Sequence, residues 1–217
     1  MAALAPPPDP ALLADPLGDP APRPFRLCLN TRTIRGQRLS LPDVVEVAAA
    51  AGYEAVEPWV DELDRHVDEG GDLAAVGARL RDLGIAVESA IGFFDWISDD
   101  PAARAAGLAE ARRSMERVRA VGGLRIAAPA FGAHTPGSPR IDLLAAADRY
   151  RTLLELGAEI GVVPMVEVWG FSANLSRLGE GLLVASESGH PDASLLADVY
   201  HLYKGGSPVE SLRPVRG

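Results

Sequence analysis

One unit repeats along most of the chain: a helix-forming stretch, then a glycine, then a short apolar run. The glycines stand at positions 52, 84, 122, 161 and 189, which places them 28 to 39 residues apart. A glycine just after a helix takes the left-handed conformation without a Cβ penalty, so these positions are typical of helix C-termini. Strands that alternate with helices at such intervals indicate βαβ units and a parallel sheet. The chain is therefore predicted to be an α/β protein.

The predicted elements follow this repeat. Helices are expected over residues 41–51, 72–83, 101–121, 141–160 and 175–188. Strands are expected over residues 25–30, 53–60, 85–90, 124–130, 162–168 and 194–199. The six strand segments are short and apolar, as is usual for parallel strands that are buried on both faces.

Two architectures fit this pattern, an open doubly wound sheet and a (β/α) barrel. No Gly-x-Gly-x-x-Gly motif follows the first strand, so the fingerprint of a dinucleotide-binding sheet is missing. Polar residues gather at the carboxyl ends of the strands: Asn30, Glu57, Glu88, His134, Glu167 and Asp198. In a barrel these ends converge on one face, where active sites lie. We therefore predict an incomplete TIM-type barrel of parallel strands, with about six of the eight βα units.

The N-terminal segment differs in composition from the rest. Its first 22 residues hold seven prolines, which remove backbone donors and oppose both helix and sheet. Residues 1–23 are therefore predicted to be a disordered Pro/Ala-rich tail, and residues 24–217 the barrel. The N-terminus lacks the basic-then-apolar order of a signal peptide, and there is no apolar run of about 18 residues that would span a membrane. We expect a cytoplasmic protein without a membrane partner.

Charge and cysteine usage narrow the range of partners. The net charge of −9 disfavours nucleic acid, because phosphate binding requires a basic surface that releases counterions. The single cysteine, Cys28, excludes an internal disulfide and fits a reducing compartment. Because Cys28 lies within the apolar run FRLCL, we predict that it is a packed core residue.

Two carboxylates stand out as candidate ligands. Glu167 and Asp198 each end an apolar strand, where burying an unpaired carboxylate costs several kcal/mol. A divalent cation would offset that cost, and so would an arginine or a set of backbone amides. We predict that both residues bind a metal; two oxygen ligands with an imidazole suit Mn²⁺, Mg²⁺, Co²⁺ or Zn²⁺. The alternative for Asp198 is an N-cap of a helix that begins at Tyr200.

Other residues near the strand ends are candidates for chemistry or binding. His201 lies three residues after Asp198 and is predicted to be catalytic, with a purely structural histidine as the alternative. Glu57 and Glu88 close two strands, where they would act as acid/base groups at the pocket rim or pair with arginines. Aromatic side chains at a barrel mouth suit the apolar faces of a sugar. The predicted substrate-binding residues are Glu57, Glu88, Trp59, His134 and Trp169.

Six segments resemble a known family in their order and spacing. They are LNTRT, AGYEAVEPW, ESAIGF, RIAAPAFG, PMVEVWG and LLADVYHLYKGG, one at each predicted strand. Together they resemble the xylose-isomerase-like TIM-barrel superfamily, and within it the sugar phosphate isomerase/epimerase group, over residues 25–212. That resemblance implies a divalent metal held by a Glu, an Asp, a His and a Glu from strands five to eight.

The first two of these ligands map onto Glu167 and Asp198, and the histidine of the Asp-x-x-His arrangement maps onto His201. The resemblance implies that His201 contacts substrate or supports the site. It also implies that Glu167 moves a proton at a carbon next to a carbonyl, which the metal polarises.

The sequence departs from the family pattern after the sixth strand. The strand that carries the ligand histidine and the strand that carries the second glutamate have no counterpart, whereas a complete barrel takes about 250 residues. We expect a chain truncated at its C-terminus. A degenerate, inactive family member and a barrel that a partner chain completes are the open alternatives.

The sequence thus predicts a metal-dependent isomerase- or epimerase-type protein for a small sugar, an inositol derivative or a hydroxy-keto acid, and whether it is an active enzyme stays open. One alternative is a non-catalytic barrel that binds a ligand or a partner. Another is an endonuclease IV-like nuclease, against which the four histidines and the negative charge argue. The expected partner is a small sugar-like substrate, and a homo-oligomer is left open.

Overall fold

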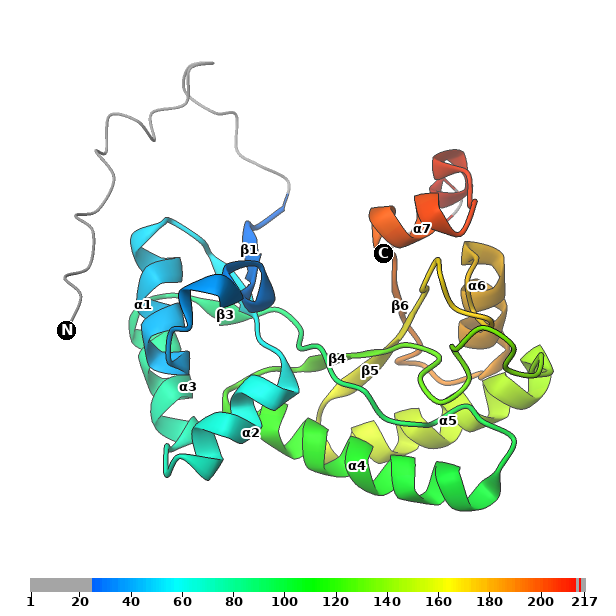
Figure 1. Ribbon diagram of the computed structural model, residues 1–217, viewed down its shortest axis with the longest axis horizontal. Helices are drawn as coiled ribbons and strands as arrows, with labels where there is room; N and C mark the ends of the chain where they lie inside the picture. Colours follow the sequence, from blue (N-terminus) through cyan, green and yellow to red (C-terminus); the bar gives the residue numbers. More distant parts are fainter. Residues whose placement is uncertain (1–24, 214, 216–217) are drawn as a thin grey trace.

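The computed structural model describes residues 25–213 and 215, so the tail predicted over residues 1–23 lies outside the described residues. Strands and helices follow one another in the predicted order, with one additional helix, α2, before α3 (Figure 1). The strands are β1 (Cys28–Asn30), β2 (Ala55–Glu57), β3 (Ala86–Val87), β4 (Arg125–Ala128), β5 (Val163–Glu167) and β6 (Leu195–Leu196). The helices are α1 (Leu41–Ala50), α2 (Val60–Asp68), α3 (Leu73–Asp82), α4 (Pro101–Ala120), α5 (Leu143–Ile160), α6 (Leu178–Glu187) and α7 (Val199–Lys204). Two 3₁₀ helices, η2 (Thr31–Gln37) and η3 (Val209–Leu212), follow β1 and α7.

All neighbouring strands pair in parallel, in the orders β1-β2-β3 and β4-β5-β6. Backbone hydrogen bonds join the two sheets: the Ala90 amide donates to the Arg125 carbonyl at 3.1 Å, and the Ala127 amide donates to the Ala90 carbonyl at 2.8 Å. The six strands therefore follow one another in chain order around a curved layer. This confirms the parallel TIM-type architecture.

Capping residues set the helix starts. Asp100 accepts a hydrogen bond from the Ala102 amide at 2.9 Å at the start of α4, where Pro101 is the first helical residue. Asp142 does the same for α5, accepting from the Ala145 amide at 2.9 Å. Such caps satisfy amides that have no partner within the helix. Gly161 ends α5 with a φ of 81°, in the left-handed region that glycine tolerates.

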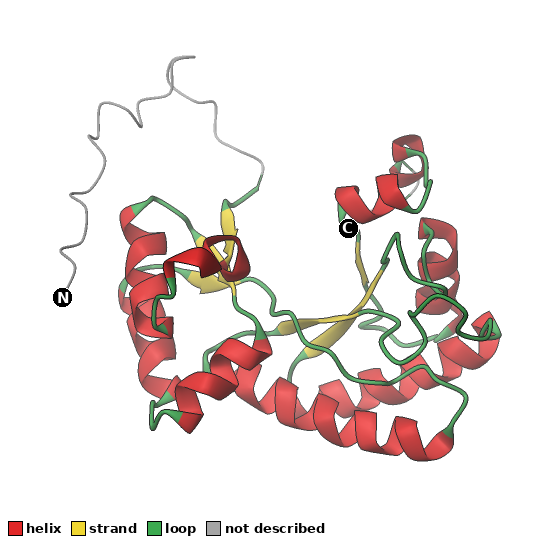
Figure 2. Cartoon of the chain, in the orientation of Figure 1, coloured by secondary structure: helices red, strands yellow, loops and turns green. Residues whose placement is uncertain are grey.

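The core lies between the strands and the helices. Ile126 and Val166 from the strands and Met115 and Leu153 from α4 and α5 are fully buried in one large apolar cluster. The helices α1 to α6 line the outer, convex side of the curved sheet (Figure 2). No helix in the described part of the chain has the length and apolar character needed to cross a membrane.

The sheet does not close into a ring. Among the described residues, β1 pairs only with β2, and β6 pairs only with β5. A gap separates these two strands (Figure 1). A closed barrel of this type has eight strands, so the described chain forms the incomplete barrel that the sequence predicted.

Three features differ from the predictions. Residues 60–68 form helix α2, which is absent from the predicted helices. The strands are shorter than predicted, with two to five residues each. The prediction that Cys28 is a packed core residue is wrong, because the side chain is exposed on β1. The physical reason is that β1 pairs with β2 alone among the described residues, so Cys28 has a flanking strand on one side only.

Candidate active-site cleft

A cleft of about 350 Å³ opens at the carboxyl ends of the strands. Its lining comes from both halves of the sheet: Asn30, Glu57, Trp59, Ile91, Phe93, Glu167, Trp169, Phe171, Leu196, Asp198 and His201. Asn30, Glu57 and Glu167 are the last residues of β1, β2 and β5. Parallel pairing aligns these strand ends, so residues far apart in the sequence share one wall. Six predicted site residues thus meet here, namely Glu57, Trp59, Glu167, Trp169, Asp198 and His201.

Glu167 is a buried carboxyl group, only 5% exposed. Its Oε2 atom is buried and makes no hydrogen bond. Burial is the main cause that raises the pKa of Glu167 to about 8; a hydrogen bond with Trp169 lowers it, and the negative charges of Glu57 and Asp198 raise it. A buried oxygen without a partner is costly unless a ligand or cation supplies one. Glu167 is therefore the strongest indication of a bound polar group in this cleft.

Asp198 lies in the same cleft and caps helix α7. Its Oδ1 accepts hydrogen bonds from the Tyr200 amide at 2.7 Å and the His201 amide at 3.1 Å. The N-cap considered from the sequence is thus present in the structure. A cap uses one carboxylate oxygen, so a cation could still bind the other. The described residues contain no group of three or more His, Cys, Asp or Glu side chains that could hold a metal.

Glu57 is held by Asn30 of β1 and by Ser89, which lies just after β3. The Asn30 Nδ2 atom donates to Glu57 Oε2 at 2.7 Å, and the Ser89 hydroxyl donates to Oε1. The Trp59 indole donates to Asn30 Oδ1 at 3.0 Å. Arg32 lies over the Trp59 ring, 4.2 Å from its centroid. This network fixes Glu57 and Trp59 at the wall of the cleft, with Asn30 as the link between them.

The two predicted histidines lie in aromatic surroundings. The His201 ring is 5.5 Å from Phe171 and 6.4 Å from Trp169, and partial burial lowers the pKa of His201. His134 stacks on Phe131 at 5.1 Å and meets the edge of Trp169 at 5.6 Å. The buried Nδ1 atom of each histidine has no hydrogen-bond partner. His201 lines the cleft, whereas His134 is not among the lining residues.

Aromatic rings form one wall of the cleft. The Trp59 and Phe93 centroids are 5.4 Å apart, Phe93 and Trp169 are 5.6 Å apart, and Trp169 and Phe171 are 5.1 Å apart. This row of tilted rings offers an apolar surface beside the carboxylates of Glu57 and Glu167. The sequence placed Trp59 and Trp169 here but missed Phe171 and Asn30 as substrate-contact candidates. The position of Phe171, two residues after Trp169, was the one available signal.

Glu88 is placed differently from the prediction. Its carboxylate binds Arg26 at 2.6 Å and Arg125 at 3.1 Å, and it is not among the residues that line the cleft. Both arginines lie near the amino ends of their strands, Arg26 before β1 and Arg125 at the start of β4. These ion pairs draw the Glu88 carboxylate away from the mouth, so the pairing with arginine considered from the sequence is what the structure shows.

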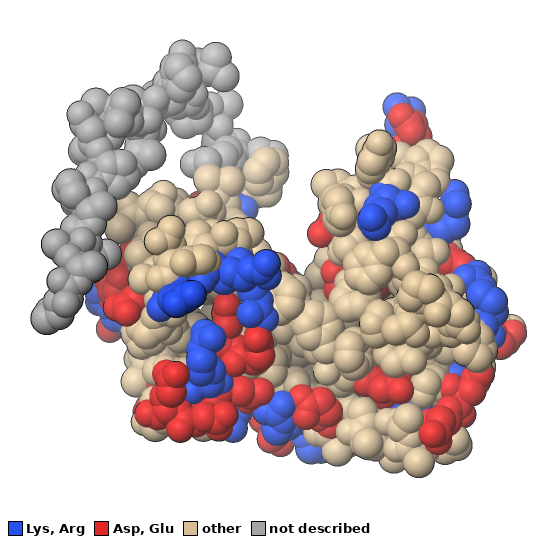
Figure 3. All heavy atoms as spheres, viewed as in Figure 1, with Lys and Arg blue, Asp and Glu red and all other residues tan. Residues whose placement is uncertain are grey.

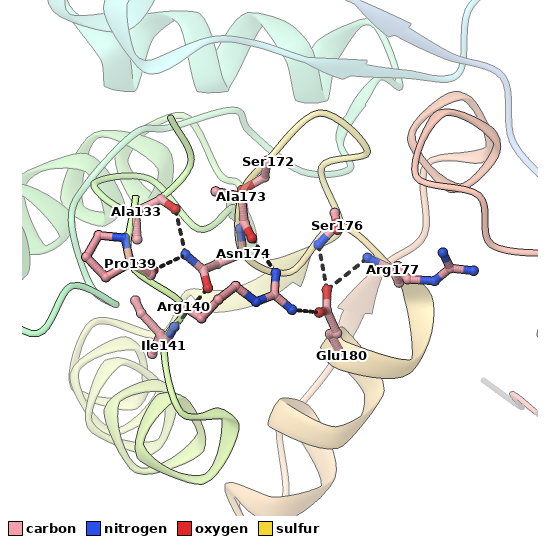
Figure 4. A network of polar contacts seen from close by, with 10 residues as sticks. All are labelled: Ala133, Pro139, Arg140, Ile141, Ser172, Ala173, Asn174, Ser176, Arg177 and Glu180. Carbon is pink, nitrogen blue, oxygen red and sulfur yellow. Dashed lines mark hydrogen bonds and ion pairs between the residues drawn. The ribbon is translucent and has the colours of Figure 1, made fainter. Parts of the chain in front are cut away.

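The loops after β4 and β5 are tied together by Asn174 (Figure 4). Its Nδ2 atom donates to the Ala133 and Pro139 carbonyls, each at 2.9 Å, and its Oδ1 atom accepts from the Ile141 amide at 2.9 Å. All three side-chain hydrogen bonds of this buried amide are made to the loop that carries His134. Asn174 therefore keeps that loop packed against the segment that follows Trp169.

Two glycines allow close packing between helix α7, with the turn after it, and the loop after β5. A Cβ atom at Gly170 would collide with the His201 carbonyl, and one at Gly205 would collide with the Ser176 carbonyl. The backbone of α7 and of the turn that follows it can approach the loop after β5 this closely only because both positions lack a side chain. This close approach brings Asp198 and His201 to the cleft.

The parallel strands, the surrounding helices and the carboxylates at the strand ends place the chain in the class of (β/α)-barrel proteins, whose active sites lie at this face. The family model for the xylose isomerase-like TIM barrel matches residues 45–215. The chain therefore belongs to the xylose isomerase-like TIM barrel family, as the resemblance of its strand-end motifs predicted. A comparison with curated protein sequences gives no match.

Solved structures share this fold. A xylose isomerase-like TIM barrel/4-hydroxyphenylpyruvate dioxygenase fusion protein is 20% identical, with a TM-score of 0.71 over 82% of this chain and 27% of that one. The IOLI protein with a bound zinc atom is 18% identical, with a TM-score of 0.74 over 87% and 68%. The 3-keto-D-glucoside 4-epimerase YcjR from E. coli is 22% identical, with a TM-score of 0.65 over 81% and 70%. The chain thus spans about a quarter of the fusion protein and about two thirds of the other two.

Proposed function

We propose that the chain is a metal-assisted isomerase- or epimerase-type protein whose cleft binds a small polyhydroxylated carbonyl compound, such as a sugar or an inositol derivative. The observation that carries this proposal is the buried Oε2 atom of Glu167, which has no hydrogen-bond partner, in a residue that lines the cleft together with Asp198. The similarity to an epimerase and to a zinc-binding protein of the same fold supports it.

The donor set fits a hard divalent cation in part. Glu167 and Asp198 would hold it through carboxylate oxygens, which suit Mn²⁺, Mg²⁺, Co²⁺ or Zn²⁺ with water in the other positions. A bound cation would polarise a substrate carbonyl and make the neighbouring C–H bond more acidic. The buried Oε2 atom of Glu167 has no hydrogen-bond partner, so it is the cleft oxygen best suited to bind such a cation.

The remaining groups have separate tasks in this proposal. Glu167 would take a proton from the carbon next to the substrate carbonyl, or return one to it. Glu57, fixed by Asn30, would accept hydrogen bonds from substrate hydroxyls, and His201 would contact a further polar atom of the substrate. The aromatic row from Trp59 to Phe171 would cover the apolar face of the ring and exclude water.

A titration with Mn²⁺ tests the metal site. The parent chain should bind Mn²⁺ in calorimetry and gain thermal stability, because a ligand of the folded state stabilises it. Glu167→Gln and Asp198→Asn should each weaken binding by about tenfold or more. Asparagine caps helices as well as aspartate does, so Asp198→Asn keeps α7 capped while it removes the charge. Glu116→Gln, a change at an exposed carboxylate outside the cleft, is the control.

Equal Mn²⁺ binding by the parent and both cleft variants would overturn the metal role. Proton transfer is tested separately, by incubating the Mn²⁺-loaded chain with ketohexoses in D₂O and following deuterium at the carbon next to the carbonyl by NMR. Incorporation that Glu167→Gln abolishes is the expected result.

A second candidate is a non-catalytic member that binds a sugar-like ligand. The observation that favours it is that the described residues offer two cleft carboxylates as metal ligands and no group of three. Sugar-dependent stabilisation of the parent chain, without deuterium incorporation in the presence of Mn²⁺, would select this alternative.

A further inference from the structure

A second cavity lies in the amino-terminal half of the barrel, and none of its lining residues lines the candidate site. It has a volume of about 450 Å³ and lies among η2, the start of α1 and helix α2. Four arginines line it, namely Arg32, Arg35, Arg38 and Arg65. Arginine side chains gather over this part of the molecule in the space-filling view, with acidic side chains beside them (Figure 3). Such a concentration of positive charge is unexpected in a chain of net charge −9.

Three of the four arginines are not neutralised. Arg35, Arg38 and Arg65 are exposed and form no ion pair with any residue that the structure describes. Arg32 is the exception, because it binds Asp61 at 2.6 Å and lies over the Trp59 ring. Three guanidinium groups that share one cavity repel one another unless an anion lies between them. The cavity is therefore suited to a ligand of high negative charge.

The acidic groups of the cavity do not replace such a ligand. Glu62 is buried in the wall, where it accepts hydrogen bonds from the Thr31 hydroxyl and from the Trp59 amide at 3.2 Å. It makes no ion pair with the three free arginines. Glu69 is exposed and also lines the cavity, so its charge opposes an incoming anion.

The other wall of the cavity is apolar. Ile34, Leu39, Leu41 and Val44 line it beside the arginines. Charged and apolar surfaces side by side suit an organic molecule that carries a phosphate group, because guanidinium binds phosphate oxygens in a bidentate manner and the carbon part packs on the apolar side. An inorganic ion alone would leave the apolar wall uncovered.

From these features we propose that the cavity formed by η2, α1 and α2 is a binding site for a phosphorylated small molecule, with Arg35, Arg38 and Arg65 as the phosphate ligands. The site is separate from the candidate active-site cleft and does not depend on the function proposed for that cleft. Arg32 lies between the two, since it lines the cavity and also covers the Trp59 ring of the cleft.

Calorimetry with tripolyphosphate on the full chain, at about 0.15 M ionic strength to screen weak surface attraction, tests the proposal. The parent should bind it, and the double variant Arg35→Gln/Arg38→Gln should bind at least about tenfold more weakly. The matched control is Arg81→Gln/Arg119→Gln, which removes the same charge from exposed arginines that do not line the cavity and form no ion pair with a described residue. The control should bind like the parent, and Glu69→Gln should bind more tightly.

Three results would overturn the proposal: no binding by the parent at millimolar tripolyphosphate, an equal loss in the control double variant, or an unchanged affinity in the cavity double variant. Circular dichroism of each variant shows whether it is folded, and single variants at the same positions replace a double variant that is not. Glucose 6-phosphate compared with inorganic phosphate then tests the apolar wall. Tighter binding of the organic phosphate is expected, and equal binding would reduce the site to one for a bare ion.

Discussion

At the scale of single residues, the position of a side chain in the sheet sets its acidity. Glu167 and Cys28 lie at opposite ends of their strands, β5 and β1, and the pKa of each is raised mainly by loss of contact with water. The negative charges of Glu57 and Asp198 also raise the pKa of Glu167. Those of Glu57 and Glu88 also raise the pKa of Cys28. Both groups are therefore held in the neutral form over a wider pH range than usual.

The stability of the metal-free chain should fall as the pH rises from about 4.5 to about 8, because folded Glu167 keeps its proton across this window and unfolded Glu167 releases it. The stabilisation that the raised pKa gives the folded state is fully present below about pH 4.5 and is lost as the pH approaches about 8. Its size is on the order of a few kcal/mol. Urea unfolding in EDTA at several pH values measures it. Glu167→Gln should flatten the slope; identical slopes in the parent and the variant would contradict the assignment, and Glu116→Gln serves as the control.

Cys28 should react slowly with iodoacetamide in the native chain. The residue is exposed, but its thiol is partly covered, and this desolvation together with Glu57 and Glu88 raises the pKa to about 12. Because the thiolate is the nucleophile, the rate at pH 8 should be at least about tenfold below that of the urea-unfolded chain. The single cysteine makes the measurement by mass spectrometry unambiguous. Equal rates in the two states would refute the expected suppression.

At the scale of elements, the helices were the most predictable part. Apolar spacing, Asp caps and terminal glycines are local signals, and five helices begin and end within about three residues of the predicted limits. Helix α2 was missed because its many charges outweighed the apolar spacing of Val60, Leu63 and Val67. The cleft residues at the strand ends were also predictable from a local signal, because each is a polar residue at the end of an apolar segment. The link from Asn30 to Trp59 was not, because it depends on how β1 pairs with β2.

Two glycines in helices should respond in opposite ways to alanine. A Cβ atom at Gly107 in α4 would collide with the Asp95 carbonyl, so Gly107→Ala should destabilise the chain by about 1–3 kcal/mol. Gly179 in α6 has no atom within 4 Å of its Cβ position, so Gly179→Ala should be neutral or stabilise by up to about 1 kcal/mol. Urea denaturation compares the two. A Gly107→Ala variant as stable as the parent would mean that α4 does not pack on the backbone at Asp95.

At the scale of the whole molecule, the core is unevenly distributed. The strands β4 and β5 lie within the main apolar cluster, whereas α7 contributes Leu202 to a small separate cluster with Val168 and Leu178. The alternation of elements predicted the parallel sheet. The exposure of Cys28 could not be predicted from its apolar neighbours, because it depends on whether the ring of strands closes.

Native-state hydrogen exchange should separate these regions. The amides of Val163 and Val166, which donate to the Leu124 and Ser194 carbonyls, should exchange only through global unfolding. The amide of Leu202 in α7 should exchange through local opening at a lower free energy. Equal free energies of opening for Val166 and Leu202 would show that α7 unfolds together with the main core.

The close packing of α7 against Gly170 has a thermodynamic consequence for ligand binding in the cleft. Asp198 caps α7 and His201 lies in it, and this short helix packs in the small apolar cluster apart from the main core, so a ligand that contacts them must also hold that helix in place. Part of the interaction energy would then be used to order protein, and binding would be accompanied by a larger negative heat-capacity change than the ligand's own surface requires. Affinity would consequently weaken faster on warming than it would in a barrel whose walls are all rigid.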